Sequence, residues 1–145
     1  MDTRQIELVQ TSFEKVASLG LPAIELFYSE LFAIEPSLKS MFKGDMKEQQ
    51  KKLLAALSLV VRALHTPEKI LEPVRKLAVK HLDYGVKPEH YTYVGNALLR
   101  TLAKGLGAEF TPELRRAWTD AFRLLATVMK EAAYSRSTVQ VRGAA

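Results

Sequence analysis

The chain has 145 residues, of which 48% are hydrophobic and 26% charged, and this composition predicts a single domain with one core. It contains no cysteine, which excludes disulfides, thiol catalysis and thiolate metal sites. The net charge is +5, but lysine and arginine are mixed with acidic residues along the chain, so we expect a solvated surface and no nucleic-acid partner. We find no signal-peptide pattern and no apolar run of roughly 20 residues, and therefore expect a cytoplasmic protein without a membrane partner.

The elements predicted from the N-terminus onward are helical, because apolar residues recur with a helical period and no strand-like alternation persists. A first helix stops at Gly20. A second begins near Pro22 and ends at Glu35, since a proline follows it. A short turn and then a polar connection are expected over residues 36–42 and 44–50.

Four further helices complete the prediction. The first of these helices has apolar residues along one face from residue 53 to residue 64, and Gln49 lies one turn before that face begins. The next is predicted to start at residues 66–68 and the last at 111–113, because both tripeptides read Thr-Pro-Glu, which combines an N-cap hydroxyl, a first-turn proline and an acid. Between these two, another helix is predicted to begin at residues 88–89 and to end at Gly105 and Gly107.

These elements predict an all-α domain of about six to seven helices over residues 1–134. Residues 135–145 read as a flexible, basic C-terminal tail. Proline and glycine fall at the boundaries between elements, so nothing in the sequence divides the chain into two domains.

One histidine stands at the end of an apolar helix face in AVKHLDYGV, residues 78–86, after Ile70, Val74 and Leu77. A neutral imidazole has one donor and one acceptor to satisfy, so spacing alone fits a core histidine bonded to a backbone carbonyl. Zinc takes three or four protein ligands, and this helix offers one. A lone ligand is sufficient where a cofactor supplies the remaining coordination, as haem does with its four planar nitrogens.

The order of six short segments resembles the globin family, specifically bacterial single-domain globins and the haem domain of flavohaemoglobins. The segments are FYSELF, EPSLKSMF, EQQKKL, AVKHLDYGV, EHYTYVG and AWTDAF, and the resemblance covers residues 5–133 approximately. Each segment has little specificity alone, and their order and spacing carry the resemblance. It implies a globin fold around one pocket that holds haem b.

The resemblance implies a distal side of that pocket, where gas binds. Tyr28 and Gln49 match two polar residues that stabilise bound O₂, and Leu53 matches the apolar wall one turn later. Phe42 matches the phenylalanine that stacks on the haem. Each residue also has a plain structural alternative: Phe42 as core, Tyr28 with its hydroxyl reaching water, and Gln49 on the surface.

The resemblance also implies a proximal side, where His81 matches the iron ligand and Tyr91 a nearby tyrosine. Lys80 is placed to meet a haem propionate, although a solvated lysine is its structural alternative. In flavohaemoglobins a glutamate joins the histidine and tyrosine, but its position here falls at Ala133, with Glu131 two residues away. Other residues implied to line the pocket are Leu77, Val86, Val94, Leu125 and Met129.

The resemblance leaves more than one function open. The first is reversible binding of O₂ and other diatomic gases, including NO and CO, for oxygen transport, storage or scavenging. The second is enzymatic: an NO dioxygenase, which would need a reductase acting in trans. A sensor would need an output module, which we do not find in the sequence. A haem-free helical interaction domain would leave Tyr28, Gln49 and His81 together unexplained.

Overall fold

The computed structural model describes residues 1–135, and within them every regular element is helical, which confirms the all-α prediction. The elements, in chain order, are α1 (Thr3–Ala17), α2 (Leu21–Ile34), η1 (Pro36–Met41), α3 (Met46–Arg62), η2 (Pro67–Lys69), α4 (Leu71–Asp83), α5 (His90–Leu106), η3 (Gly107–Glu109), α6 (Pro112–Lys130) and the π-turn η4 (Glu131–Ser135). The predicted tail lies outside the described residues, apart from Ser135. No single described helix is long and apolar enough to cross a membrane; α1 and α2 meet that test only as a pair bent by 104°.

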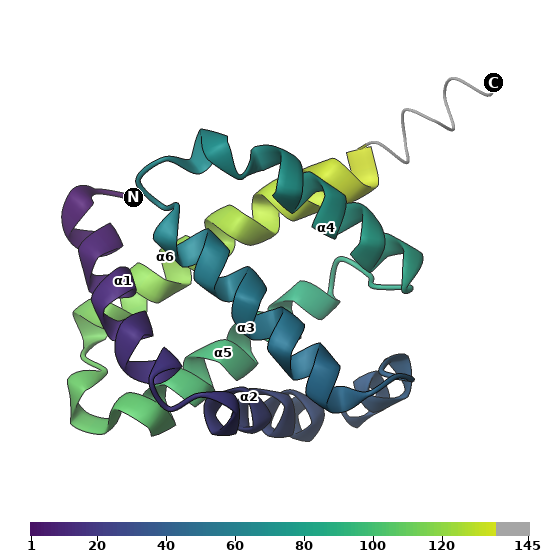
Figure 1. Cartoon of the computed structure of the whole chain (residues 1–145), viewed down its shortest axis with the longest axis horizontal. Helices are drawn as coiled ribbons and strands as arrows, with labels where there is room; N and C mark the ends of the chain where they lie inside the picture. Colours follow the sequence, from purple (N-terminus) through teal and green to yellow (C-terminus); the bar gives the residue numbers. More distant parts are fainter. Residues whose placement is uncertain (136–145) are drawn as a thin grey trace.

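The helices pack at steep angles to one another and not as a parallel bundle (Figure 1). In that view α2 runs along the bottom of the molecule, α3 crosses its middle, and α4 lies along the top. The helix α5 packs on α2, α1 and α6, while α4 packs on α6 and the turn η4. The helix α3 packs instead on α1 and α2. The helices α3 and α4 are therefore held in place by different neighbours.

A buried polar contact fixes the part of the core where α1 meets α6. Trp118 is 3% exposed, and its indole N–H donates to the Ser12 hydroxyl over 2.9 Å. Ser12 in turn donates to the backbone carbonyl of Leu8 over 2.7 Å, so neither buried group loses its hydrogen bonds on folding. Val9 and Leu102 pack around this contact and are almost fully buried.

Two predicted boundaries were wrong. The polar connection predicted over residues 44–50 is largely helical, because Asp45 caps α3 by accepting a hydrogen bond from the Lys47 backbone N–H over 2.9 Å. The helix predicted to start at residues 66–68 forms only the turn η2, and α4 begins at Leu71. Pro73 has no N–H to donate to a preceding turn, and it is tolerated only in the first turn of a helix.

The second Thr-Pro-Glu prediction is confirmed. The Thr111 hydroxyl accepts a hydrogen bond from the Leu114 backbone N–H over 3.2 Å, and α6 begins at Pro112. Thr66, by contrast, makes no such bond from its side chain. The same tripeptide therefore starts a helix only where no second proline interrupts the next turn.

Candidate functional site

His81 lies near the end of α4 and is half-buried. Its Nδ1 atom is 2.8 Å from the backbone carbonyl oxygen of Leu77, one turn earlier on the same helix. A carbonyl oxygen can only accept, so Nδ1 carries the proton and Nε2 keeps a free lone pair. This bond fixes the tautomer and orientation of the ring and leaves Nε2 able to bind a metal ion.

Tyr28 and Gln49 come from different helices, α2 and α3, and the structure brings their side chains together. Tyr28 is 5% exposed, whereas Gln49 is half-buried. Burial raises the pKa of the Tyr28 phenol, and a side-chain hydrogen bond with Gln49 partly opposes this shift in pKa. The phenol therefore stays protonated near neutral pH and offers an O–H donor.

Phe42 follows the turn η1 and is half-buried among aromatic rings. Its ring centroid lies 5.4 Å from that of Tyr28 and 5.5 Å from that of Phe32, and both contacts are edge-to-face. Such contacts hold the two phenyl rings and the phenol in fixed relative orientations. The predicted stacking residue and the predicted hydrogen-bond donor thus form one rigid group.

Two separate apolar clusters collect most of the residues that the sequence assigned to one pocket. The α2–α3 cluster contains Tyr28 and is joined by Phe42, Leu53 and Val94. The α4–α6 cluster contains Tyr91 and Met129 and is joined by Leu77, Val86 and Leu125. The first set includes the predicted distal residues, and the second surrounds the helix that carries His81.

Tyr91 is 6% exposed, and its hydroxyl is buried without a hydrogen-bond partner among the described residues. Burial raises its pKa to about 12, and the neighbouring Tyr134 phenol adds to the rise. The Tyr134 hydroxyl itself donates to the backbone carbonyl of Val86 over 2.7 Å, which connects the turn η4 to the loop after α4. Ala133, at the position implied for a glutamate, is 2% exposed.

Lys80 is exposed, and it forms no ion pair among the described residues. Its ammonium is therefore available to an anionic group that approaches α4 from solvent. The solvated alternative given above describes it equally well in this structure.

The arrangement as a whole fits a haem group. His81 supplies one metal-binding nitrogen, which is all that a porphyrin-held iron needs from its proximal side. No other arrangement of metal ligands competes, because the described residues hold no group of three or more histidine, cysteine, aspartate or glutamate side chains suited to a metal ion. Haem also needs apolar walls, and the two clusters include apolar side chains of α3 and α4.

Two residues were missed by the sequence prediction. Gln50 is 8% exposed and its side-chain oxygen has no partner among the described residues. Its spacing to Leu54, Leu57 and Val61 places it on their face of α3, and this signal was available in the sequence. Tyr134 gave no such signal, because its bond to Val86 depends on how α6 ends.

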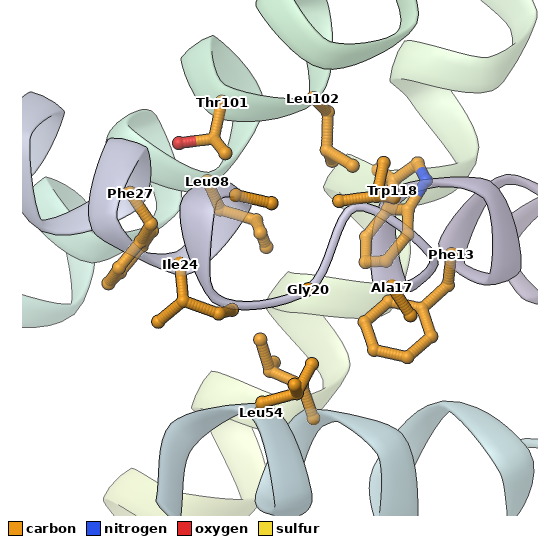
Figure 2. Close-up of a pocket in the computed structure, with 13 residues that line it drawn as sticks. Phe13, Ala17, Gly20, Ile24, Phe27, Leu54, Leu98, Thr101, Leu102 and Trp118 are labelled. Carbon is orange, nitrogen blue, oxygen red and sulfur yellow. The ribbon is translucent and has the colours of Figure 1, made fainter. Parts of the chain in front are cut away.

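A small apolar cavity lies between the first two helices and α3, α5 and α6, and none of the site residues predicted from the sequence lines it (Figure 2). Its volume is about 20 Å³, which leaves room for about one water molecule. Figure 2 shows Phe13 and Trp118 on one side, Ile24 and Phe27 on another, and Leu54 facing them from α3. It is lined almost entirely by apolar atoms, so it is a packing gap in the core and not the site predicted from the sequence.

Comparison with known proteins points to one family. Residues 25–129 match the family described as Globin. The chain is 31% identical over 143 residues to a flavohemoprotein of Rhizobium meliloti, covering 94% of this chain and 36% of that protein. It is 30% identical over 129 residues to a flavohemoprotein of Xylella fastidiosa, covering 87% of this chain and 32% of that protein. The chain thus spans about a third of the length of these relatives.

Two solved structures share the fold. A bacterial globin from Campylobacter jejuni superposes with a TM-score of 0.83 at 25% identity, covering 94% of this chain and 99% of that one. A protein from Rhodothermus marinus, engineered as a carbene transferase, superposes with a TM-score of 0.87 at 23% identity, covering 97% and 99%. These superpositions confirm the fold that the sequence resemblance implied.

Proposed function

This chain belongs to the globin family, and we propose that it holds haem b between α3 and α4 and binds O₂ and other diatomic gases reversibly. The observation that carries the proposal is the His81 ring, which is oriented by the Leu77 carbonyl and keeps Nε2 free. The family itself implies a haem cofactor. The gas-binding role and the residues that serve it are our inference.

Haem, when bound, supplies an iron atom with one position open to a small gas molecule. In our proposal His81 Nε2 would hold that iron from the α4 side. Leu77, Val86, Leu125 and Met129 cover the same side with apolar atoms. Phe42 and Leu53 cover the other side and limit the entry of water.

Tyr28 and Gln49 determine how tightly a gas is retained in this proposal. Both side chains can donate a hydrogen bond, and Gln49 lies close enough to Tyr28 to lower the pKa of its phenol. A donor that is pre-oriented in a dry site strengthens its bond to a polar ligand. We therefore expect these donors to increase the affinity for O₂, which becomes polar on binding, more than the affinity for CO.

A visible spectrum tests the proposal directly. Protein produced with an adequate haem supply should show an intense Soret band, and His81→Gly should lose most of it. His65→Gly is the matched control, because His65 is exposed on the segment between α3 and η2. A wild-type protein without a Soret band, or a His81→Gly protein with normal haem content and gas affinity, would contradict the proposal.

The second candidate function is NO dioxygenase activity, which the similarity to flavohemoproteins favours. It requires electrons from a reductase. Steady NO consumption in aerobic buffer, measured with and without an added flavin reductase and NADH, separates the two functions. Sustained turnover only with the reductase supports the enzyme, and a single stoichiometric reaction in both cases supports the reversible binder.

A further inference from the structure

We infer that the exposed lysines of the turn η1 and of the first turns of α3 form a docking surface for an acidic electron-transfer protein. We call this the lysine surface and define it by Lys39, Lys43, Lys47 and Lys52. The inference rests on the proposed haem site and deepens it, because it identifies the chemical character of the partner that would reduce the haem.

More than half of the chain's net charge comes from this one segment. Residues 39–52 contain five lysines and two acidic residues, which gives a net charge of +3, while the whole chain carries +5. All five lysines are exposed. The positive end of the α3 dipole lies in the same segment, at the start of the helix. In Figure 1 the turn η1 and the start of α3 form the lower right corner of the molecule, and we expect a positive potential there that attracts acidic proteins.

The acidic residues of this region are already engaged. Glu48 pairs with Lys51 over 3.5 Å. Asp45 accepts a hydrogen bond from the Lys47 backbone N–H, and Glu35 accepts one from the serine hydroxyl two residues later. The lysines that form no ion pair among the described residues are Lys39, Lys43, Lys47 and Lys52. Their ammonium groups are therefore available to carboxylates of a partner.

Apolar side chains alternate with these lysines along the chain. Met41, Phe42 and Met46 are half-buried, so each keeps part of its surface open to solvent. Protein–protein contacts need apolar surface at their centre, whereas charges at the rim mainly steer the approach and select the partner. The segment offers both, which a purely solvated charged face would not.

The lysine surface borders the proposed gas-binding pocket through residues of the same segment. Phe42 directly precedes Lys43, and its ring contacts that of Tyr28 at a centroid distance of 5.4 Å. Gln49, two residues after Lys47, lies close enough to Tyr28 to lower the pKa of its phenol. A protein docked on the lysines would therefore lie beside the pocket.

Both candidate functions need an electron donor, because both use ferrous iron. After the iron has been oxidised, one electron must pass from a reduced donor to the haem. Ferric iron then becomes ferrous, the donor is oxidised, and no proton has to be transferred. A donor with an acidic surface is attracted and oriented by the lysines, so charge complementarity selects this class of partner.

Binding of a plant-type [2Fe–2S] ferredoxin, a small acidic electron carrier, tests the inference. Calorimetry with the haem-loaded protein should show binding that weakens by at least about 10-fold between about 20 and 200 mM NaCl, since salt screens exposed charges. The double variant Lys43→Glu/Lys47→Glu should weaken binding at low salt by at least about 10-fold. It should fold normally, because the α3 dipole favours a glutamate in the first turn. The rate constant for reduction of the ferric haem by reduced ferredoxin should fall by a similar factor.

The double variant Arg115→Glu/Arg116→Glu is the matched control. Both arginines are exposed near the start of α6, and neither forms an ion pair among the residues that the structure describes. The start of α6 lies at the left in Figure 1, on the other side of the molecule from the lysine surface. This variant has the same change in net charge and should alter ferredoxin binding by less than about 2-fold, because exposed charges far from the contact are screened. The rate of CO association with the reduced protein should be the same in all three proteins.

No measurable binding of ferredoxin at low salt, or an equal loss of binding in the two double variants, would overturn the inference. Binding to phosphatidylglycerol vesicles that depends on Lys43 and Lys47, without binding of ferredoxin, would also overturn it, because the surface would then serve an anionic membrane. Protein without a Soret band would instead refute the haem site, and calorimetry would still decide whether the lysine surface binds an acidic protein.

Discussion

Tyr28 combines two properties that a gas-binding site needs from a hydrogen-bond donor. Its side chain is 5% exposed, so bulk water does not compete for the hydroxyl. Its ring is also fixed by edge-to-face contacts with Phe27 and Phe42, at centroid distances of 5.2 and 5.4 Å. A fixed donor does not have to be ordered when a ligand binds, so more of the hydrogen-bond energy appears as affinity.

Tyr28→Phe should therefore raise the O₂ dissociation rate by roughly 10- to 100-fold, because a hydrogen bond to a charged or strongly polarised group contributes about 1.5–3 kcal/mol. The CO dissociation rate should change much less, since bound CO is less polar. Stopped-flow displacement of O₂ by CO measures the first rate, and Tyr93→Phe serves as a control for the loss of a hydroxyl. An unchanged O₂ rate would show that the phenol does not contact the ligand.

Glycine 95 shows how a residue without a side chain positions two helices. A Cβ atom added at this position of α5 would lie 2.8 Å from the Phe122 ring of α6, which is closer than real contacts allow. Gly105, on the same helix, would place its Cβ no closer than 3.9 Å to Val16, which is ordinary contact. The close approach of α5 and α6 therefore requires a glycine at position 95 but not at position 105, although both glycines interrupt a helical pattern in the sequence.

We expect Gly95→Ala to destabilise the protein by about 1–3 kcal/mol, because the Phe122 ring must move out of a packed interface. Gly105→Ala should stabilise it by about 0.5–1 kcal/mol, because alanine loses less backbone entropy in a helix. Urea unfolding of both variants beside the wild type measures the difference. Equal effects of the two substitutions would mean that α5 and α6 do not approach as closely as the structure indicates.

Sequence patterns predicted the number of helices and most of their boundaries, because these depend on local chemistry. Thr111 caps its helix through a bond that any N-cap threonine can make. The errors arose where two local signals competed. Thr66 is followed by two prolines in eight residues, and the second moved the helix start to Leu71. Asp45 was assigned to a connection because the residues after it are polar, although it caps α3.

The candidate site was less predictable, because it depends on contacts between elements that are distant in sequence. The resemblance named Tyr28 and Gln49, but only the folded chain brings Gln49 close enough to Tyr28 to affect the pKa of its phenol. Sequence spacing did not reveal that the Tyr91 hydroxyl has no described partner, or that Tyr134 binds the Val86 carbonyl. These features follow from the path of the chain after α6, which helical periodicity does not determine.

At the scale of the whole molecule, the helices differ in how firmly they are held. The core helices α1, α2 and α5 each pack on at least two other helices, whereas α4 packs on α6 and on the short turns η2 and η4. Among the α4 side chains that the structure describes, Val74 and Ala78 are the two that are buried. Because α4 packs on fewer of the described helices than α1, α2 or α5 does, it is the helix that we expect to open first in local unfolding.

Hydrogen exchange should report this difference and also its dependence on haem. Peptides from residues 71–83 should exchange faster than those from residues 3–17 in haem-depleted protein. Loading with haem should slow exchange in α4 by at least about 10-fold, because a ligand that binds only the closed form stabilises it in proportion to its saturation. In the proposed site a bond from His81 to the iron would attach α4 directly to the cofactor, so most of the added protection should fall there, while α1 changes little. Exchange measured by mass spectrometry on wild type and His81→Gly distinguishes this bond from general stabilisation: the substitution should remove the added protection of α4 even when haem is supplied in excess. Equal protection of α1 and α4 on loading would mean that the cofactor stabilises the fold as a whole and not through position 81.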